Sequence, residues 1–399
     1  MTKTEIVDAA FKVWGRNFYR KTSLSQLAVE LKVSKPALYR HFENKQALTE
    51  AMTERFLDDF AASIRADFER ARQTEDADEG ILTIVRSVSG FFARNVYALI
   101  FSLINIYDRN LDGHAISQRL SERGVDMTTL TFIIEKKYDA DLSVIHMIYA
   151  TLTFFMAYFH KTEQSHKKPP SEEKIQNMLS VICKIIEQGV GYSAKKIDAI
   201  DLEKQETRVG VSVDAEIEPL FKAVAEAVAE VGPWDASMDM VAKRLGLSKS
   251  SLYGHFKNKK DMLRRLFSGE FKRIIKFARQ GIGLSDISEE QLYLGIFAIT
   301  VYFRSHPEFL ISLDWIRTRK LDLGKPEKGT DIFRLFEDVD IEPVRGGEDE
   351  KQRISHWILF LLINILTKQG RTVSAVDVQN NDIRVLYRFI TLGLGGFKR

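Results

Sequence analysis

Residues 34–45 read SKPALYRHFENK, and residues 248–259 read SKSSLYGHFKNK. When the second stretch is shifted by 214 residues, eight of the twelve positions are identical, far more than chance provides. The apolar pattern upstream follows the same shift without a gap, so that Ile6 matches Leu220 and Leu31 matches Leu245. A repeat at a fixed offset is the signature of a duplicated structural unit. The chain is therefore a tandem of two related halves.

Each half is predicted to begin with a series of short helices. Thr2 and Glu5 have the spacing of a capping box, and apolar residues follow them at helical intervals. The caps predicted for the second, third and fourth helices are Ser23, Ser34 and Asn44 in the first half and Ser237, Ser248 and Asn258 in the second. Lys32-Val33 occupies the turn between the second and third helices, and Gly246 takes the position of Lys32 in the repeat. Glycine adopts the left-handed backbone conformation of such a turn at lower energetic cost than other residues do.

Two short helices joined by a tight turn, the second carrying Lys, Tyr and His, describe a helix-turn-helix. The pattern in both halves resembles the N-terminal DNA-binding domain of the tetracycline-repressor (TetR) family. That family's signature runs approximately Val-Ser-Lys-x-x-Leu-Tyr-x-His-Phe-x-Asn-Lys, and the resemblance covers about 45 residues of each half. The remainder of each half is compatible with the family's helical ligand domain.

The resemblance implies that the third helix of each half enters the major groove of DNA. Carried over by position, with the second-helix caps included, the DNA-binding residues are Ser23, Lys35, Pro36, Ala37, Tyr39, Arg40, His41 and Lys45, then Ser237, Lys249, Ser250, Ser251, Tyr253, Gly254, His255 and Lys259. Lysine donates to phosphate or guanine, and a helix N-terminus such as that at Lys45 or Lys259 favours a phosphate. For His41 and His255, packing inside the domain competes with a phosphate contact. Leu38, Phe42, Leu252 and Phe256 are expected on the buried face.

The charge distribution supports DNA binding more than the total charge does. The net charge is only +3, yet residues 239–280 hold twelve Lys and Arg against three acidic residues. Residues 1–50 hold nine against five. The two third helices also differ, because Arg40 corresponds to Gly254 and Pro36-Ala37 to Ser250-Ser251. We therefore expect an asymmetric operator with two unlike half-sites, about 34–36 Å apart or a multiple of that.

The rest of the chain predicts an all-α fold built as two tandem units. The expected domains are a helix-turn-helix domain at 1–48, a helical ligand-binding and dimerisation-like domain at 49–191, a linker at 192–214, a second helix-turn-helix domain at 215–262 and a second helical domain at 263–399. Each half ends in two long apolar helices, at 142–159 and 175–188 and at 354–366 and 383–392. In the family, such helices form a four-helix dimer interface. One chain carrying both pairs is expected to be an intramolecular pseudo-dimer.

Several other classes of protein are disfavoured. Residues 142–159 carry no charge and reach the length of a membrane span, but their Ser, Thr and His favour a helix buried in a bundle. Cys183 stands alone, so no internal disulfide and no secretion are expected. The histidines lack metal-ligand spacing, and there is no Gly-rich phosphate loop or nucleophile motif. We expect no enzyme activity, no metal and no cofactor.

The sequence thus predicts a ligand-responsive DNA-binding transcriptional regulator of the bacterial cytoplasm, acting as a repressor. Its partners are a double-stranded DNA operator and an unidentified small-molecule effector, for which the abundance of aromatic residues favours an apolar molecule. The chain is expected to act as a monomeric pseudo-dimer, with further association left open. The alternative is a regulatory or scaffolding protein that keeps the fold while one or both helix-turn-helix domains no longer bind DNA.

Overall fold

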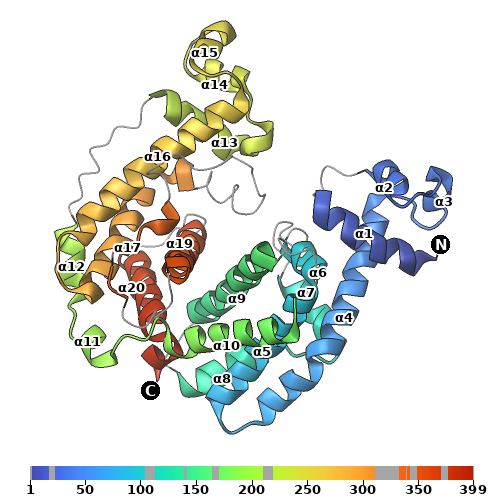
Figure 1. Cartoon of the computed structure of the whole chain (residues 1–399), viewed down its shortest axis with the longest axis horizontal. Coiled ribbons are helices and arrows are strands. Elements are labelled where there is room, and N and C mark those ends of the chain that lie inside the picture. The colour runs from blue at the N-terminus through green and yellow to red at the C-terminus, as the bar shows by residue number, and fades with distance from the viewer. Residues whose placement is uncertain are drawn as a thin grey trace. The chain divides into compact units, whose positions relative to one another are not determined.

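The computed structural model describes residues 2–17, 23–103, 113–138, 142–163, 170–209, 219–310, 332–337, 339–341, 348–369 and 376–398. The regular structure of these residues is helical, as the sequence predicts, and they form no strand (Figure 1). The helices of the first half are α1 (Lys3–Asn17), α2 (Leu24–Glu30), α3 (Lys35–Tyr39), α4 (Lys45–Gln73), α5 (Ala77–Arg94), α6 (Val96–Phe101), α7 (Gly113–Ser121), α8 (Thr129–Lys137), α9 (Leu142–Glu163) and α10 (Glu172–Gln188). Those that follow are α11 (Ala194–Asp198), α12 (Leu202–Arg208), α13 (Pro219–Asp235), α14 (Met238–Arg244), α15 (Lys249–His255), α16 (Lys259–Ile282), α17 (Ser288–Ser305), η3 (Ile332–Arg334), α19 (Glu348–Gln369), α20 (Val376–Leu392) and η4 (Gly393–Phe397).

Contacts along the chain divide it into two compact units. Unit 1 comprises Met1–Ile145 and Leu152–Lys184 with Arg399, and unit 2 comprises His146–Thr151 and Ile185–Lys398. Unit 2 therefore contains a short segment of α9 and the end of α10, although both helices begin in the first half. Segments of both halves share the core of unit 2.

Unit 1 is organised around the long helix α4. Its inner face packs along α5 through aromatic rings, among which Phe60 and Phe91 have centroids 5.1 Å apart. Acidic residues at spacings of four line another face of α4, where Arg119 of α7 pairs with Glu50 at 2.7 Å. Arg123, just after α7, pairs with Asp58 at 2.8 Å, and both arginines also contact Glu54. These ion pairs fix α7 on α4.

Unit 2 has α16 and α17 packed side by side, with α17 also contacting α19 and α20 (Figure 1). Trp357 of α19 is fully buried, and its indole Nε1 donates to Thr151 Oγ1 of α9 at 3.1 Å. The threonine hydroxyl in turn donates to the carbonyl of Met147 at 2.7 Å. A buried indole N–H needs a hydrogen-bond acceptor, and here a helix of the other half provides it.

The ends of α10 and α20 meet at two glycines within unit 2. Gly189 has a φ of 60° and Gly393 a φ of 57°, both left-handed. The Val190 amide donates to the Ile390 carbonyl at 2.7 Å, so the two chain segments approach backbone to backbone. A Cβ on Gly189 would lie 2.6 Å from the Gly393 nitrogen, and one on Gly393 would lie 2.5 Å from the Ile186 oxygen. Glycine commonly follows the end of a helix, but the sequence does not predict that these two ends meet.

The segment between the two halves is not an extended chain where the structure describes it. The spacing of Ile197, Ile200 and Leu202 predicts a short helical stretch, and α11 and α12 form there with Ile197 buried. Glu206 of α12 accepts two bonds from the Arg384 guanidinium, at 2.6 and 2.9 Å. It also accepts from the Tyr293 hydroxyl at 2.6 Å. This part of the segment is thereby fixed on α17 and α20, while residues 210–214 lie outside the described part.

Replacing Glu206 with Gln is expected to destabilise unit 2 by about 2 kcal/mol at neutral pH, because Arg384 loses a charged acceptor at a largely buried site. Burial alone would raise the pKa of Glu206, but its hydrogen bonds from Arg384 and Tyr293 and the Arg384 charge lower it overall. A lowered pKa means that the contribution is complete above the unfolded value near ~4.3 and declines as the pH falls through the folded value. Urea unfolding at several pH values should show the two proteins converging below about pH 4. A gap that stays constant down to pH 3 would contradict this assignment.

One described helix is long and apolar enough to cross a membrane. It is α9, over Ser143–Lys161, with a mean hydropathy of 1.2, and 61% of that window is buried inside the protein. Burial of this extent is what a core helix of a bundle shows, which is the interpretation that the sequence favours.

Candidate nucleic-acid interface

The first helix-turn-helix consists of α2 and α3. Ser23 begins α2 with a capping box, because its hydroxyl accepts the Gln26 amide at 3.1 Å while the Gln26 side chain accepts the Ser23 amide at 2.7 Å. Ser34 begins α3 by accepting the Ala37 amide at 3.3 Å, and Pro36 lies in the first turn, where no N–H is needed. The turn between them is closed by Lys32, whose φ of 53° is left-handed.

The second helix-turn-helix, α14 and α15, repeats this construction. Ser237 accepts the Met240 amide at 3.2 Å, and Ser248 accepts the Ser251 amide at 3.1 Å. Gly246 closes the turn with a φ of 65°, at the position that Lys32 takes in the first copy. The hydroxyls of Ser23 and Ser237, both predicted to bind DNA, are thus each engaged in starting a helix.

A buried face fixes the third helix of each copy. Leu38 and Leu252 have no exposed surface, and Phe42 and Phe256 are 2% exposed, which confirms the four predicted core positions. The opposite face lies at the surface. The exposed predicted residues are Lys35, Pro36, Tyr39, Arg40 and His41 in the first copy and Lys249, Ser250, Ser251, Tyr253, Gly254 and His255 in the second, with Ala37 half-buried. Both histidines are exposed, so neither packs inside its domain.

The two tyrosines are the most informative of these residues. Tyr39 is 42% exposed and Tyr253 is 48% exposed, although large aromatic side chains are usually buried. They occupy the same position of the repeat, and each lies four residues after an exposed lysine. An exposed tyrosine beside an exposed lysine places a hydroxyl and an ammonium group next to each other. Phosphate oxygens of DNA can accept hydrogen bonds from both.

The lysines of the two copies have different surroundings. Lys35 lies over the ring of Tyr39, with Nζ 5.7 Å from the ring centroid. Lys249 instead donates to Asp239 at 2.9 Å, and this hydrogen bond, together with the charge of Asp239, raises the pKa of the lysine. The sequence shows that Asp239 stands where the first copy has Ser25. Whether Asp239 contacts Lys249 depends on how α14 and α15 cross.

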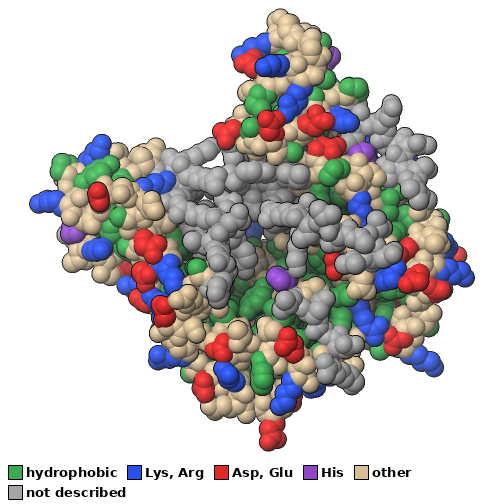
Figure 2. Space-filling view, turned by 180° about the vertical axis from the view of Figure 1, so that it is seen from behind, with side chains coloured by type: hydrophobic (Ala, Val, Ile, Leu, Met, Phe, Trp, Pro, Cys, Tyr) green, Lys and Arg blue, Asp and Glu red, His purple; other side chains and the backbone are tan. Residues whose placement is uncertain are grey.

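The fourth helix of each copy begins where the sequence predicts. Asn44 accepts the Ala47 amide at 2.8 Å to start α4 at Lys45, and Asn258 accepts the Asp261 amide at 2.9 Å to start α16 at Lys259. The Asp261 carboxylate accepts the amide of Lys257, one residue before the cap. Lys45 and Lys259 therefore lie at the positive ends of long helices. Figure 2 shows Lys and Arg side chains among acidic and apolar ones on both domains.

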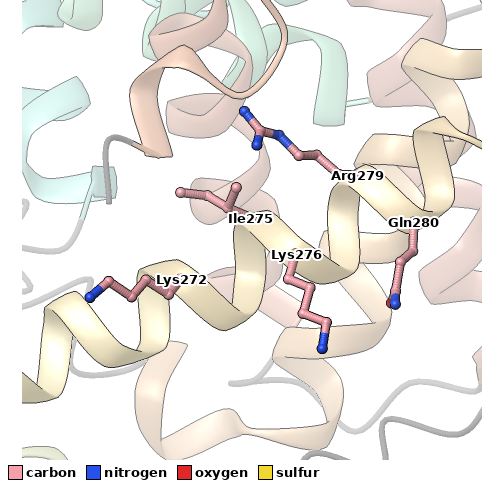
Figure 3. A pocket seen from close by; sticks show the side chains of 5 residues that line it. All are labelled: Lys272, Ile275, Lys276, Arg279 and Gln280. Atoms are coloured by element: carbon pink, nitrogen blue, oxygen red, sulfur yellow. The ribbon is translucent and has the colours of Figure 1, made fainter. Parts of the chain in front are cut away.

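A shallow hollow lies farther along α16. It is lined by Lys272, Ile275, Lys276, Arg279 and Gln280, which project from successive turns of the helix (Figure 3). Its lining is largely cationic, which does not match the apolar lining expected of the effector pocket. Within the described residues, His, Cys, Asp and Glu form no group of three that would hold a metal ion.

Comparison with known proteins identifies the repeated domain. The family described as bacterial regulatory proteins, tetR family, matches residues 6–52 and again residues 220–266, which include both helix-turn-helix copies and the starts of α4 and α16. The solved structures similar to this chain include the TetR family transcriptional regulator PfmR from Thermus thermophilus, at 18% identity and a TM-score of 0.34, covering 45% of this chain and 95% of that one. The fatty acid degradation regulator FadR from Bacillus halodurans shares 17% identity at a TM-score of 0.34, covering 42% and 93%. The two matched segments, rather than these structures, identify the family.

Proposed function

Because the chain belongs to the tetR family of bacterial regulatory proteins and carries the family's DNA-binding domain twice, we propose that it is a transcriptional repressor that binds its operator as a single-chain pseudo-dimer. A regulatory protein agrees with the prediction that the chain is not an enzyme. The observation that carries the proposal is the pair of third helices, each held by a buried Leu and Phe and each presenting an exposed Lys and Tyr.

In this proposal α3 and α15 each enter a major groove. Lys35 and Lys249 donate to phosphate or to a guanine edge, and Tyr39 and Tyr253 donate to phosphate oxygens. Arg40 carries a guanidinium that can donate to guanine, whereas Gly254 at the matching position has no side chain. The two half-sites therefore differ in sequence, and a strict palindrome does not fit both helices equally well.

The pseudo-dimer is supported by the shared core of unit 2. Trp357 bonds to Thr151 of the first half, and the segment after Gly189 bonds to the end of α20. Such contacts between the last helices are those a dimer of the family would make between subunits. We further propose that a small apolar effector binds one helical domain and that its binding weakens DNA binding by linkage. The chain carries out this role in the bacterial cytoplasm.

The second candidate is a scaffolding protein whose helix-turn-helix domains no longer bind DNA. Loss of that role would remove any requirement for exposed Lys and Tyr at matching positions, yet both copies retain them. The charge pair between Lys249 and Asp239 is the one observation that favours a weakened second copy. The two candidates differ in whether the chain selects particular DNA sequences.

Selection of DNA fragments from a random or genomic pool by the purified chain tests the proposal. We expect recovery of duplexes with two half-sites of different sequence, one helical turn or a small multiple of it apart. Recovery of a strict palindrome whose arms are equally sensitive to mutation would contradict unlike half-sites. Recovery of no common sequence would favour the scaffolding role.

A further inference from the structure

The surface around the start of the fourth helix carries opposite charges in the two halves. We define the second shoulder as Lys257, Lys260, Arg264 and Arg265, four cations at the start of α16. The matching positions of the first half, 214 residues earlier, form the first shoulder. They are Glu43, Gln46, Glu50 and Ala51, which include two acids and no cation. The four positions carry +4 in the second shoulder and −2 in the first; with Asp261, which matches Ala47, included, the two surfaces differ by five unit charges.

The second shoulder is built around one acidic residue. Asp261 is 8% exposed, and its carboxylate accepts from Arg264 at 2.9 Å and from Arg265 at 3.4 Å. Arg265 also lies over the ring of Phe256, 5.8 Å from its centroid. Both arginine side chains remain more than 40% exposed, at 42% and 47%. The two guanidinium groups are therefore oriented by the protein and accessible to a ligand, an arrangement suited to phosphate oxygens.

The first shoulder faces a different partner. Glu50 pairs with Arg119 of α7 at 2.7 Å, and its neighbour Glu54 contacts both Arg119 and Arg123. Glu43 is exposed in the loop just before the Asn44 cap. An exposed acid beside the third helix repels DNA phosphate, so this shoulder does not strengthen binding to the backbone.

The second shoulder lies close to the predicted DNA contact. Lys257 and Lys260 flank the helix start at Lys259, and Arg265 follows it by six residues, or about 9 Å along the axis at 1.5 Å per residue. Lys276, on the same helix, is about 25 Å from the start by the same measure. Solvent exposure alone would explain a fourth helix that is basic along its whole length. Four cations at positions where the other half has two acids and two neutral residues, beside the same motif, require a further reason.

We propose that the second shoulder binds the DNA phosphate backbone and makes the second helix-turn-helix the electrostatic anchor of the chain. This inference rests on the proposed DNA binding. The first helix-turn-helix lacks these phosphate contacts, and its Arg40 gives it more capacity to distinguish bases. The chain then associates first through its second copy, largely without regard to sequence, and the first copy selects the site.

Salt dependence of DNA affinity distinguishes the two shoulders. Each phosphate neutralised by a cation contributes about 0.9 to the slope of log K against log salt concentration. The Lys257→Gln/Lys260→Gln variant is expected to flatten that slope by about 1.8. The reciprocal Glu43→Lys/Gln46→Lys variant is expected to steepen it by up to about 1.8. All four positions are exposed, so thermal unfolding should be unchanged.

Lys276→Gln is the matched control, since it removes one exposed charge from the same helix far from its start. We expect this variant to leave the slope unchanged. An unchanged slope in Lys257→Gln/Lys260→Gln would overturn the inference, as would an equal effect of Lys276→Gln for each charge removed. If Lys35→Ala/Tyr39→Ala and Lys249→Ala/Tyr253→Ala also bind as well as the parent protein, the proposed function itself fails; if these variants lose affinity, only the anchor is wrong.

Discussion

Removing Lys and Tyr from either third helix is expected to lower operator affinity about 100-fold. The two variants are Lys35→Ala/Tyr39→Ala and Lys249→Ala/Tyr253→Ala, each measured on a duplex that holds both half-sites. A lost contact to DNA is worth about 1–3 kcal/mol, so the pair accounts for roughly 2–6 kcal/mol, and a 100-fold loss corresponds to about 2.7 kcal/mol. The second half-site is bound at high local concentration once the first is held, so disabling either copy also removes that advantage.

The chain offers a closely matched control for this experiment. Phe132 and Lys136 on α8 are an exposed aromatic residue and an exposed lysine four positions apart, the same spacing as in the third helices but in the reverse order and with Phe in place of Tyr. Phe132→Ala/Lys136→Ala should leave DNA affinity unchanged. If both third-helix variants bound as tightly as this control, the helix-turn-helix domains would not be the DNA-binding elements. A loss in only one of them would identify a single working copy.

Alanine at Gly189 or Gly393 is expected to lower the free energy of unfolding by about 2–5 kcal/mol. A left-handed φ disfavours a residue with a Cβ by roughly 1–2 kcal/mol. In addition, the new Cβ would lie 2.5–2.6 Å from backbone atoms of the opposite helix end, and displacing packed backbone costs about 1–3 kcal/mol. Chemical denaturation that follows unit 2 measures the sum.

Two further glycines of unit 2 separate these contributions. Gly246 has a φ of 65° with nothing within 4 Å of a built Cβ, so Gly246→Ala should lose only the conformational part, about 1–2 kcal/mol. Gly254 lies inside α15 with open space around it, and Gly254→Ala should be neutral or stabilise by about 0.5–1 kcal/mol. A loss at Gly189 no larger than that at Gly246 would contradict the close backbone approach of the ends of α10 and α20.

The features that the sequence predicts well are those with local causes. Ser23 and Asn44 cap helices because each side chain accepts an amide three residues away, and the second half has caps at the matching positions. The exposed position of Tyr39 follows from the spacing of Leu38 and Phe42, which have to face inward. The residues that determine these caps and faces lie within a few positions of each other, so the sequence alone reveals them.

The features that the sequence does not predict depend on partners distant in the chain. Glu206 is one of many acids in a polar segment, and only the packing of α12 against α20 places it on Arg384, 178 residues away. The pairing of Arg119 with Glu50 likewise requires the path of α7 across α4. Gly189 and Gly393 are recognisable as helix ends, but their contact requires both halves to share one core. In each case the sequence shows the type of residue but not the residue that it contacts in the folded chain.

The number of chains bound to one operator distinguishes a single-chain pseudo-dimer from two chains that bind side by side. Native mass spectrometry or sedimentation of the purified protein with a duplex holding both half-sites gives this ratio. We expect one chain per duplex at saturation, with both half-sites protected from cleavage at the same protein concentration. Two chains per duplex, each protecting a single half-site through one helix-turn-helix, would contradict the single-chain pseudo-dimer.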